Sequence, residues 1–207
     1  MNKHISNTSQ IAVIISLIIK TLFMAVILIF GSSFFTPKIG DAIDSIHGVK
    51  VYYNGSNFAR SYGRNLAPDG YNLGLKYQCV EFVKRYYYQV YHHKMPNTQG
   101  NARDFFDKKL ADRAFNAKRG LMQYRNVREY APKAGDLLVY DSYPGNPFGH
   151  VAIIAEVGPE HVVIVQQNIG TLTRERLKLV KFLQYYTIAD YDILGWLRLE
   201  NNVSQKS

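Results

Sequence analysis

The sequence of 207 residues contains a single cysteine, Cys79. One cysteine cannot form a disulfide within the chain, and it cannot supply a zinc site built from several thiolates, so both of these small-protein strategies are excluded. The sequence also has no internal repeat and no low-complexity tract. Apolar residues make up 47% of the chain and aromatic residues 14%, which is the composition of a globular protein rather than of a disordered or fibrous one.

Acidic residues are absent before Asp41, and the run from 11 to 30 is apolar except for Lys20 and Thr21. The run could be a signal peptide with a cleavage site at residues 31–33, or an uncleaved transmembrane anchor of twenty residues. A buried core helix is the third interpretation. In both membrane interpretations the lysines stay inside and the remainder is exported. We therefore expect residues 1–35 to be a signal peptide or membrane anchor, and the domain to be periplasmic or extracellular, either secreted or anchored.

Basic residues outnumber acidic ones by 25 to 16, which gives a formal net charge of +9. Twelve of the basic residues and only four acidic ones lie between positions 84 and 133. Such an excess of positive charge can bind nucleic acid, an anionic membrane or an anionic polymer such as a cell wall. Because these bases are scattered singly through helical-looking sequence, a solvated helix face is the simpler interpretation. We expect no nucleic-acid partner.

Secondary-structure patterns predict helices in the first part of the domain and strands in the second. Apolar residues recur at three- and four-residue steps from 78 to 94, with Lys84, Arg85 and Gln89 on the opposite side, and a shorter helix is expected at 101–110. Residues 56–74 read as loop. Strands are expected at 49–53, 137–140, 150–157, 161–167, 177–183 and 193–199. This order predicts an α+β fold with an antiparallel sheet, comprising a connector at 36–47, one domain at 48–200 and a tail at 201–207.

Cys79 lies at the predicted N-terminus of the first helix, after a glycine-rich loop. Backbone N–H groups at such a position stabilise a thiolate and lower its pKa, which favours a nucleophile over an ordinary buried cysteine. Gln78 immediately before it could donate its side-chain amide to an oxyanion, and the Cys79 backbone N–H could supply a second donor.

A cysteine nucleophile needs a base, and the base needs a group that orients it. His150 follows Gly149 and opens a strongly apolar strand, which distinguishes it from the other five histidines. The next strand ends near Gln166 and Asn168, which a period of two places on one face, with Gln167 pointing away. A hairpin brings that end beside the start of the His150 strand, so either amide could orient the imidazole.

Several short motifs of this sequence also carry a family resemblance. YQCVEF at 77–82, GNA at 100–102, GDLL at 135–138, GHVAII at 149–154 and QN at 167–168 occur in the order found in CHAP domains, the cysteine- and histidine-dependent amidohydrolases/peptidases. The similarity runs from about Gly48 to Glu200. Among CHAP domains it looks closest to the amidase half of glutathionylspermidine synthetase/amidase, which shares an ILGW stretch, here at 193–196. The resemblance implies a papain-like (CHAP/NlpC-type) fold.

The resemblance implies Cys79 as nucleophile, His150 as base and Gln78 near the oxyanion. The family usually has an acidic residue two positions before the asparagine, where this chain has Gln166, so either Gln166 or Asn168 orients His150, or catalysis is impaired. The implied reaction is amide hydrolysis through a thioester, without a metal or organic cofactor. Three functions remain open: an exported hydrolase of peptidoglycan peptides, an amidase of glutathionylspermidine-like small conjugates, and an inactive CHAP module that binds the wall or a partner.

Overall fold

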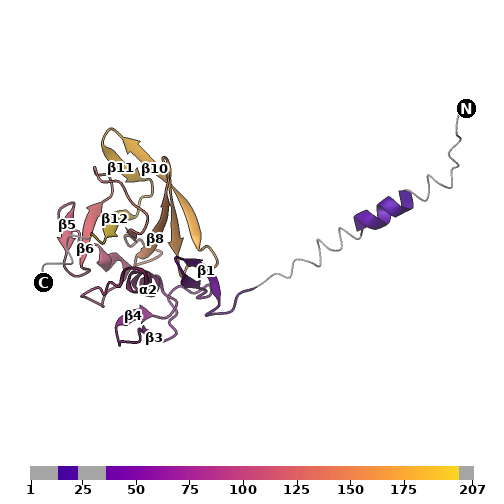
Figure 1. The fold of residues 1–207 in the computed structure, drawn as a ribbon, viewed down its shortest axis with the longest axis horizontal. Helices are drawn as coiled ribbons and strands as arrows, with labels where there is room; N and C mark the ends of the chain where they lie inside the picture. The colour runs from indigo at the N-terminus through magenta and orange to yellow at the C-terminus, as the bar shows by residue number, and fades with distance from the viewer. Residues whose placement is uncertain (1–13, 23–35, 201–207) are drawn as a thin grey trace, which may run out of the picture. The chain divides into compact units, whose positions relative to one another are not determined.

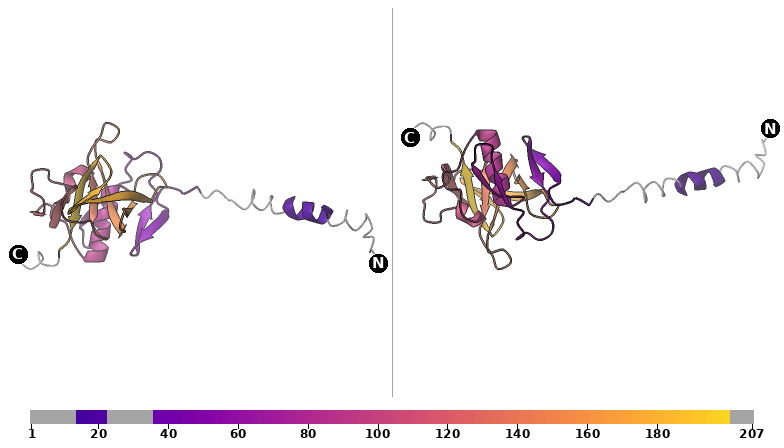
Figure 2. Two further views of the ribbon diagram at one scale, coloured as in Figure 1. Left: turned by 90° about the horizontal axis from the view of Figure 1, so that it is seen from above. Right: turned by 90° about the horizontal axis from the view of Figure 1, so that it is seen from below.

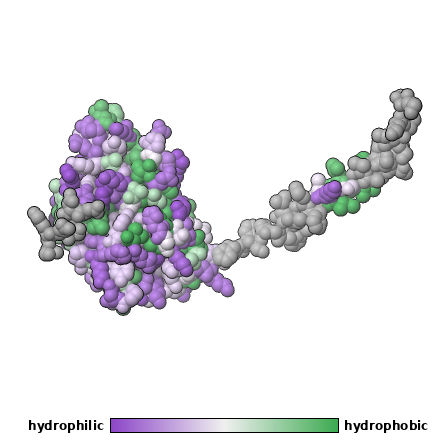
Figure 3. All heavy atoms as spheres, in the orientation of Figure 1, coloured by the Kyte–Doolittle hydropathy of each residue, from purple (hydrophilic) through white to green (hydrophobic). Residues whose placement is uncertain are grey.

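The computed structural model describes residues 14–22 and 36–200, and it divides the chain into two units, 1–36 and 37–207. Residues 14–22 are helical, and their apolar side chains, green in Figure 3, are exposed. The rest of the expected leader, and the tail at 201–207, lie outside the described residues. Within the described ranges no helix is long and apolar enough to cross a membrane. The signal peptide or membrane anchor expected at 1–35 stays a prediction.

The second unit is organised around one eight-stranded antiparallel sheet (Figure 1). Its strand order is β11-β10-β9-β8-β7-β12-β6-β5. The strands are β5 (Ala114–Asn116), β6 (Leu121–Arg125), β7 (Leu137–Tyr140), β8 (His150–Val157), β9 (His161–Gln166), β10 (Arg174–Phe182), β11 (Tyr185–Ile188) and β12 (Ile193–Arg198). The predicted α+β class and antiparallel sheet are confirmed. Strands β5, β6 and β11 were not predicted from the sequence.

Helix α2 (Cys79–Tyr91) packs on one face of this sheet, as the further views in Figure 2 also show. Tyr86, Tyr87 and Phe82 fill the space between helix and sheet. The opposite side of the helix was expected to face solvent, but Lys84 and Arg85 are buried. The reason is that the short strands before the helix cover that side, so some of the basic residues counted in the sequence are not on the surface.

Two small hairpins provide this cover, and both correct the sequence reading. Strand β1 (Ala42–Ile46) pairs with β2 (Val49–Tyr52), so the range 36–47, expected to be a connector, contains a strand. Strand β3 (Arg64–Leu66) pairs with β4 (Asn72–Leu75) inside the expected loop at 56–74. These strands have three to five residues and many polar positions, so their pairing depends on packing against α2 rather than on a pattern of their own.

The helix expected at 101–110 is a single turn of 3-10 helix, η1 (Ala102–Phe105). Asn101 caps it as predicted, because its side chain and that of Asp104 each bond the other residue's backbone. The turn ends at Phe106, whose backbone is extended. Phe105 and Phe106 join the core below α2, which makes η1 a fixed neighbour of strand β8.

On the face of the sheet opposite α2, side chains from different strands pack against one another. The buried cluster on this face consists almost entirely of strand residues around Trp196. The sheet curls far enough that Asn126, just after β6, exchanges two hydrogen bonds with the backbone of Ile188 in β11. The strands that carry the candidate site, β8 and β9, thus lie in the centre of a closed and well-packed layer.

Candidate active site

Cys79 is the first residue of α2 and is buried. Gln78 before it has extended backbone dihedral angles, so the chain turns sharply into the helix at this point. The sulfur accepts hydrogen bonds from the backbone at Cys79 itself, Val80 and Val151. The last of these contacts places the sulfur beside the peptide that follows His150.

Burial decides the protonation of this thiol. Desolvation raises the pKa of Cys79 to about 11, against the opposing effect of the three backbone hydrogen bonds. The lowered pKa expected from the helix N-terminus is therefore wrong for the free protein, because the energetic cost of a buried charge outweighs the helix-end N–H groups. Burial likewise lowers the pKa of His150 to about 4, although its bond to Gln166 acts in the other direction. At neutral pH the pair is thus a thiol and a neutral imidazole.

His150 begins β8, and Gly149 brings it close to η1. Gly149 has a φ of +72°, and a Cβ atom there would lie 2.7 Å from the Tyr140 carbonyl oxygen and 2.8 Å from the Cβ of Arg103. The Arg103 N–H also donates to the carbonyl of Phe148 at 3.0 Å. Only glycine fits this junction without strain, and the junction fixes where the imidazole enters the site.

Gln166, the last residue of β9, lies against His150. The two atoms His150 Nε2 and Gln166 Oε1 are 3.0 Å apart. Because an amide oxygen can only accept, His150 carries its proton on Nε2, and Nδ1 is left with a lone pair that can accept a proton. Of the two amides that the sequence left open, the structure brings Gln166 to the imidazole.

Asn168 lies elsewhere, because the strand has ended before it. Its φ is +75°, so the alternation that would have put it on the face of Gln166 does not extend to it. Its amide nitrogen donates to Gln78 Oε1 at 2.7 Å and to the Phe58 carbonyl at 2.9 Å. Its oxygen accepts from Asn54 at 2.6 Å. Asn168 therefore holds the loop at the cavity wall rather than the histidine.

Gln78 completes that arrangement. Its amide nitrogen donates to the carbonyl oxygens of Phe58 at 3.0 Å and Arg60 at 2.7 Å. An amide nitrogen has two hydrogens, and both have an acceptor here. For Gln78 to donate to an oxyanion it would have to release one of these carbonyls, whereas the backbone N–H of Cys79 already points to the sulfur.

Sequence reasoning missed a buried cluster behind the cysteine. Glu81 and Arg85 form an ion pair with 2.5 Å between Arg85 Nε and Glu81 Oε1, and both are buried. Gln167, which points away from Gln166 as predicted, donates to the Gln78 carbonyl and to Glu81, both at 3.0 Å. It also accepts from the Tyr52 N–H at 2.7 Å. The helical spacing of Glu81 and Arg85 was the available signal for their pairing.

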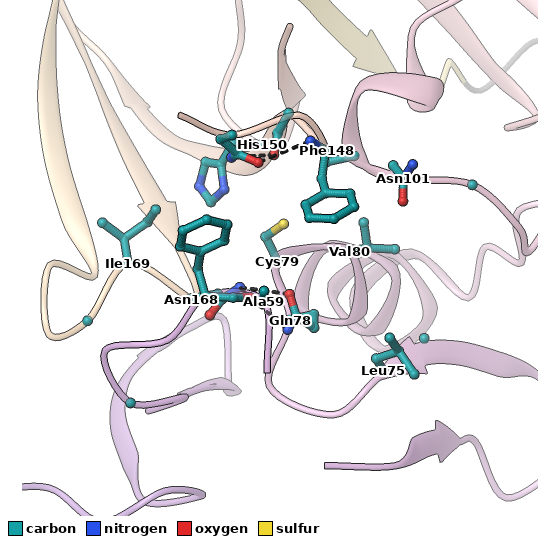
Figure 4. Close-up of a pocket in the computed structure, with 18 of the residues that line it drawn as sticks. Ala59, Leu75, Gln78, Cys79, Val80, Asn101, Phe148, His150, Asn168 and Ile169 are labelled. Carbon is teal, nitrogen blue, oxygen red and sulfur yellow. Dashed lines mark hydrogen bonds between the residues drawn. The ribbon is translucent and has the colours of Figure 1, made fainter. Parts of the chain in front are cut away.

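A cavity of about 430 Å³ opens over Cys79 and His150 (Figure 4). Cys79, His150, Gln78 and Asn168 all contribute to its lining, together with apolar side chains such as Phe58 and Phe148. Figure 4 shows the Cys79 sulfur turned toward the side of the cavity where the rings of His150 and Phe148 lie. Within the described ranges no cluster of three or more potential metal ligands occurs.

Comparisons with known proteins place this site in a family. Residues 69–168 match the family described as "CHAP domain". The bifunctional glutathionylspermidine synthetase/amidase of Escherichia coli (strain K12) is 32% identical over 149 residues, which covers 65% of this chain and 23% of that protein. Endolysin PlyTW of Staphylococcus phage Twort is 28% identical over 96 residues, covering 44% of this chain and 19% of the endolysin.

One solved structure, "The crystal structure of Ly7917", aligns with a TM-score of 0.37 at 18% identity, covering 59% of this chain and 53% of that one. This likeness is too weak to bear on the fold, and the papain-like arrangement stays a prediction. The chain spans less than a quarter of the length of the two curated relatives named above. The segment from 69 to 168, which contains Cys79, His150 and Gln166, is a CHAP domain.

Proposed function

We propose that this protein hydrolyses an amide bond with Cys79 as nucleophile and His150 as base. The observation that carries the proposal is the placement of both side chains in the lining of one cavity, with the far nitrogen of the imidazole held by Gln166. That arrangement leaves Nδ1 of His150 as the proton acceptor. The CHAP match and the amidase named among the relatives support the same reaction class.

The proposed mechanism starts from the neutral pair. His150 Nδ1 takes the thiol proton as the Cys79 sulfur attacks the substrate carbonyl, so charge develops only when substrate has displaced water from the cavity. Backbone N–H groups at the start of α2, released from the sulfur once it bonds to carbon, stabilise the oxyanion. The imidazolium then protonates the leaving amine as the C–N bond breaks, which leaves a thioester on Cys79. A water molecule gives its proton to His150 and attacks the thioester, the C–S bond breaks to release the acid, and His150 returns the proton to the Cys79 sulfur.

We propose peptides of peptidoglycan as the substrate. The endolysin among the relatives favours this class, and the surplus of basic residues suits an anionic wall polymer. Export would bring the domain to that polymer, and it rests on the sequence of residues 11–30 alone. The similarity to a glutathionylspermidine synthetase/amidase favours the second candidate, a small peptide–amine conjugate.

The experiment is to incubate the full chain with peptidoglycan sacculi and, separately, with glutathionylspermidine, and to identify products by mass spectrometry. Cys79→Ala serves as the matched control. Wall fragments that depend on Cys79 would support the first substrate and identify the bond. Release of spermidine instead would support the second. Products of neither kind, with a folded protein, would contradict both and favour the inactive binding module.

A further inference from the structure

A carboxylate lies one side chain beyond Gln166. Glu175, on strand β10, accepts a hydrogen bond from Gln166 Nε2 with 3.3 Å between the nitrogen and Glu175 Oε2. Gln166 Oε1 in turn faces His150 Nε2 at 3.0 Å. Three side chains from three adjacent strands therefore form one chain of hydrogen bonds, His150–Gln166–Glu175, in a chain where the family's usual acidic residue is replaced by Gln166.

We propose that Glu175 is the positioning residue that sets the tautomer of His150, acting through the amide of Gln166. This proposal deepens the proposed function and rests on it. Glu175 does not touch the substrate-binding cavity around Cys79, whose lining includes His150 but neither Gln166 nor Glu175.

An amide group is ambiguous as a hydrogen-bonding partner. Gln166 by itself could present either its oxygen or its NH₂ group to His150, and the two orientations have nearly the same shape. An NH₂ group facing the ring would require an unprotonated Nε2 and would put the proton on Nδ1, where the base needs a lone pair. A directly bonded carboxylate has no such ambiguity, because both of its oxygens accept.

Glu175 determines which end of the Gln166 amide faces His150. A carboxylate can only accept, so the NH₂ group of Gln166 is held toward Glu175, and the amide oxygen is thereby directed at His150. Hydrogen bonds in such a chain also polarise one another, so the donation to a carboxylate makes the amide oxygen a stronger acceptor. When His150 becomes an imidazolium, the negative charge of Glu175 lies one amide group away from its N–H.

The surroundings leave Glu175 available for this role. Its neighbours on the strand have other partners: Arg174 pairs with Asp44 at 2.8 Å, and Arg176 contacts His161. Among the ion pairs of residues 36–200, none involves Glu175. A depression beside it is lined by His150 and Gln166 as well as by further polar residues, namely Tyr140, Asp141, Tyr143, Asn146, Asp190 and Asp192.

The test uses the full chain and an exchange of acid and amide. Glu175→Gln keeps the shape but lets either end of Gln166 face the ring, so we expect kcat to fall by about 10- to 100-fold with KM unchanged. The double variant with Gln166→Glu and Glu175→Gln moves the acid next to His150, and we expect it to recover at least the wild-type kcat. Glu160→Gln, in the exposed turn before β9, is the matched control and should leave kcat unchanged.

A readout that does not depend on activity is the ¹⁵N NMR spectrum of His150. The wild type should show the Nε2–H tautomer, Glu175→Gln a mixture of the two, and the double variant the Nε2–H tautomer again. An unchanged His150 spectrum in folded Glu175→Gln overturns the proposal, as does a loss of kcat that the exchange fails to recover. If neither substrate is cleaved by the wild type, the proposed function fails, but the spectra still decide the role of Glu175.

Discussion

The side-chain nitrogen of Asn168 donates a hydrogen bond to the side-chain oxygen of Gln78 at 2.7 Å, across ninety positions of the sequence. This contact ties the end of strand β9 to the start of α2. The same two amides bind the carbonyls of Phe58 and Arg60, so the loop that walls the cavity is held by side chains rather than by sheet pairing. The pair of residues that looked like an orienter and an oxyanion donor therefore acts here as a clasp for that loop.

Removal of the clasp should weaken substrate binding. Asn168→Gly deletes the amide but keeps the positive φ that position 168 requires. We expect the free energy of unfolding to fall by about 1–3 kcal/mol, because buried hydrogen-bond partners lose their mates. KM should rise by about tenfold for each 1.4 kcal/mol of lost loop anchoring. Urea unfolding and steady-state kinetics measure both effects. Gln184→Ala, in the exposed turn after β10, is the control, and equal KM values for the two variants would refute the clasp.

The free thiol should react slowly at neutral pH. With a pKa of about 11, Cys79 has about 300-fold less thiolate than an ordinary cysteine of pKa near 8.5. Alkylation by iodoacetamide should therefore be far slower than for free cysteine at pH 7, and should increase steadily up to pH 10. Fast alkylation at pH 6 would instead indicate a preformed thiolate–imidazolium pair and would contradict the neutral resting state.

Stability should decrease when the solution is made acidic. The pKa of His150 is about 4 in the folded protein and near 6.5 in the unfolded chain. The buried neutral imidazole therefore makes its full contribution to the free energy of unfolding above pH 6.5. That contribution is lost as the pH falls toward 4, and the free energy of unfolding changes by at most about 1.4 kcal/mol per pH unit. Urea unfolding of the wild type and of His150→Gln at pH 7, 5.5 and 4.5 isolates this contribution. Identical slopes would show that the imidazole does not resist protonation.

The buried ion pair behind Cys79 should contribute strongly to the stability of the fold. Glu81→Gln leaves the Arg85 guanidinium buried without its counter-charge, and it weakens the contact from Gln167. We expect a loss of about 3–5 kcal/mol in the free energy of unfolding. The double variant with Arg85→Met should recover much of that loss, because it removes the orphaned charge. Glu129→Gln at an exposed position serves as the matched control. A loss below about 1 kcal/mol for Glu81→Gln would contradict this account.

Sequence reasoning could predict the parts of the fold that have a strong local pattern. The helix at 79–91 has a clear helical period, and strands β7, β8, β9 and β12 are short continuous runs of mostly apolar residues. The residue that orients His150 could be limited to two candidates, Gln166 and Asn168, because the β8–β9 hairpin fixes the register of the two strands. In each case the information lies within a short segment or across one tight turn.

The remaining features depend on contacts between distant segments. Lys84 and Arg85 are buried because hairpins earlier in the chain cover them. The helical pattern of residues 79–91 cannot predict contacts with those hairpins. Asn168 leaves the strand through a positive φ, which breaks the alternation by which its position was predicted. Glu175 reaches Gln166 only because β10 pairs with β9. The raised pKa of Cys79 reflects burial by the whole domain, whereas the sequence shows only the helix end.

The most direct test of the account is to trap the acyl-enzyme. The full chain is mixed with the substrate that it cleaves, quenched with acid within a single turnover, digested and analysed by mass spectrometry. The account predicts a peptide containing Cys79 that carries the mass of the acyl fragment, and neither adduct nor cleavage in Cys79→Ala. Cleavage by Cys79→Ala at the wild-type rate would show that the bond is broken by other residues, and would contradict the account.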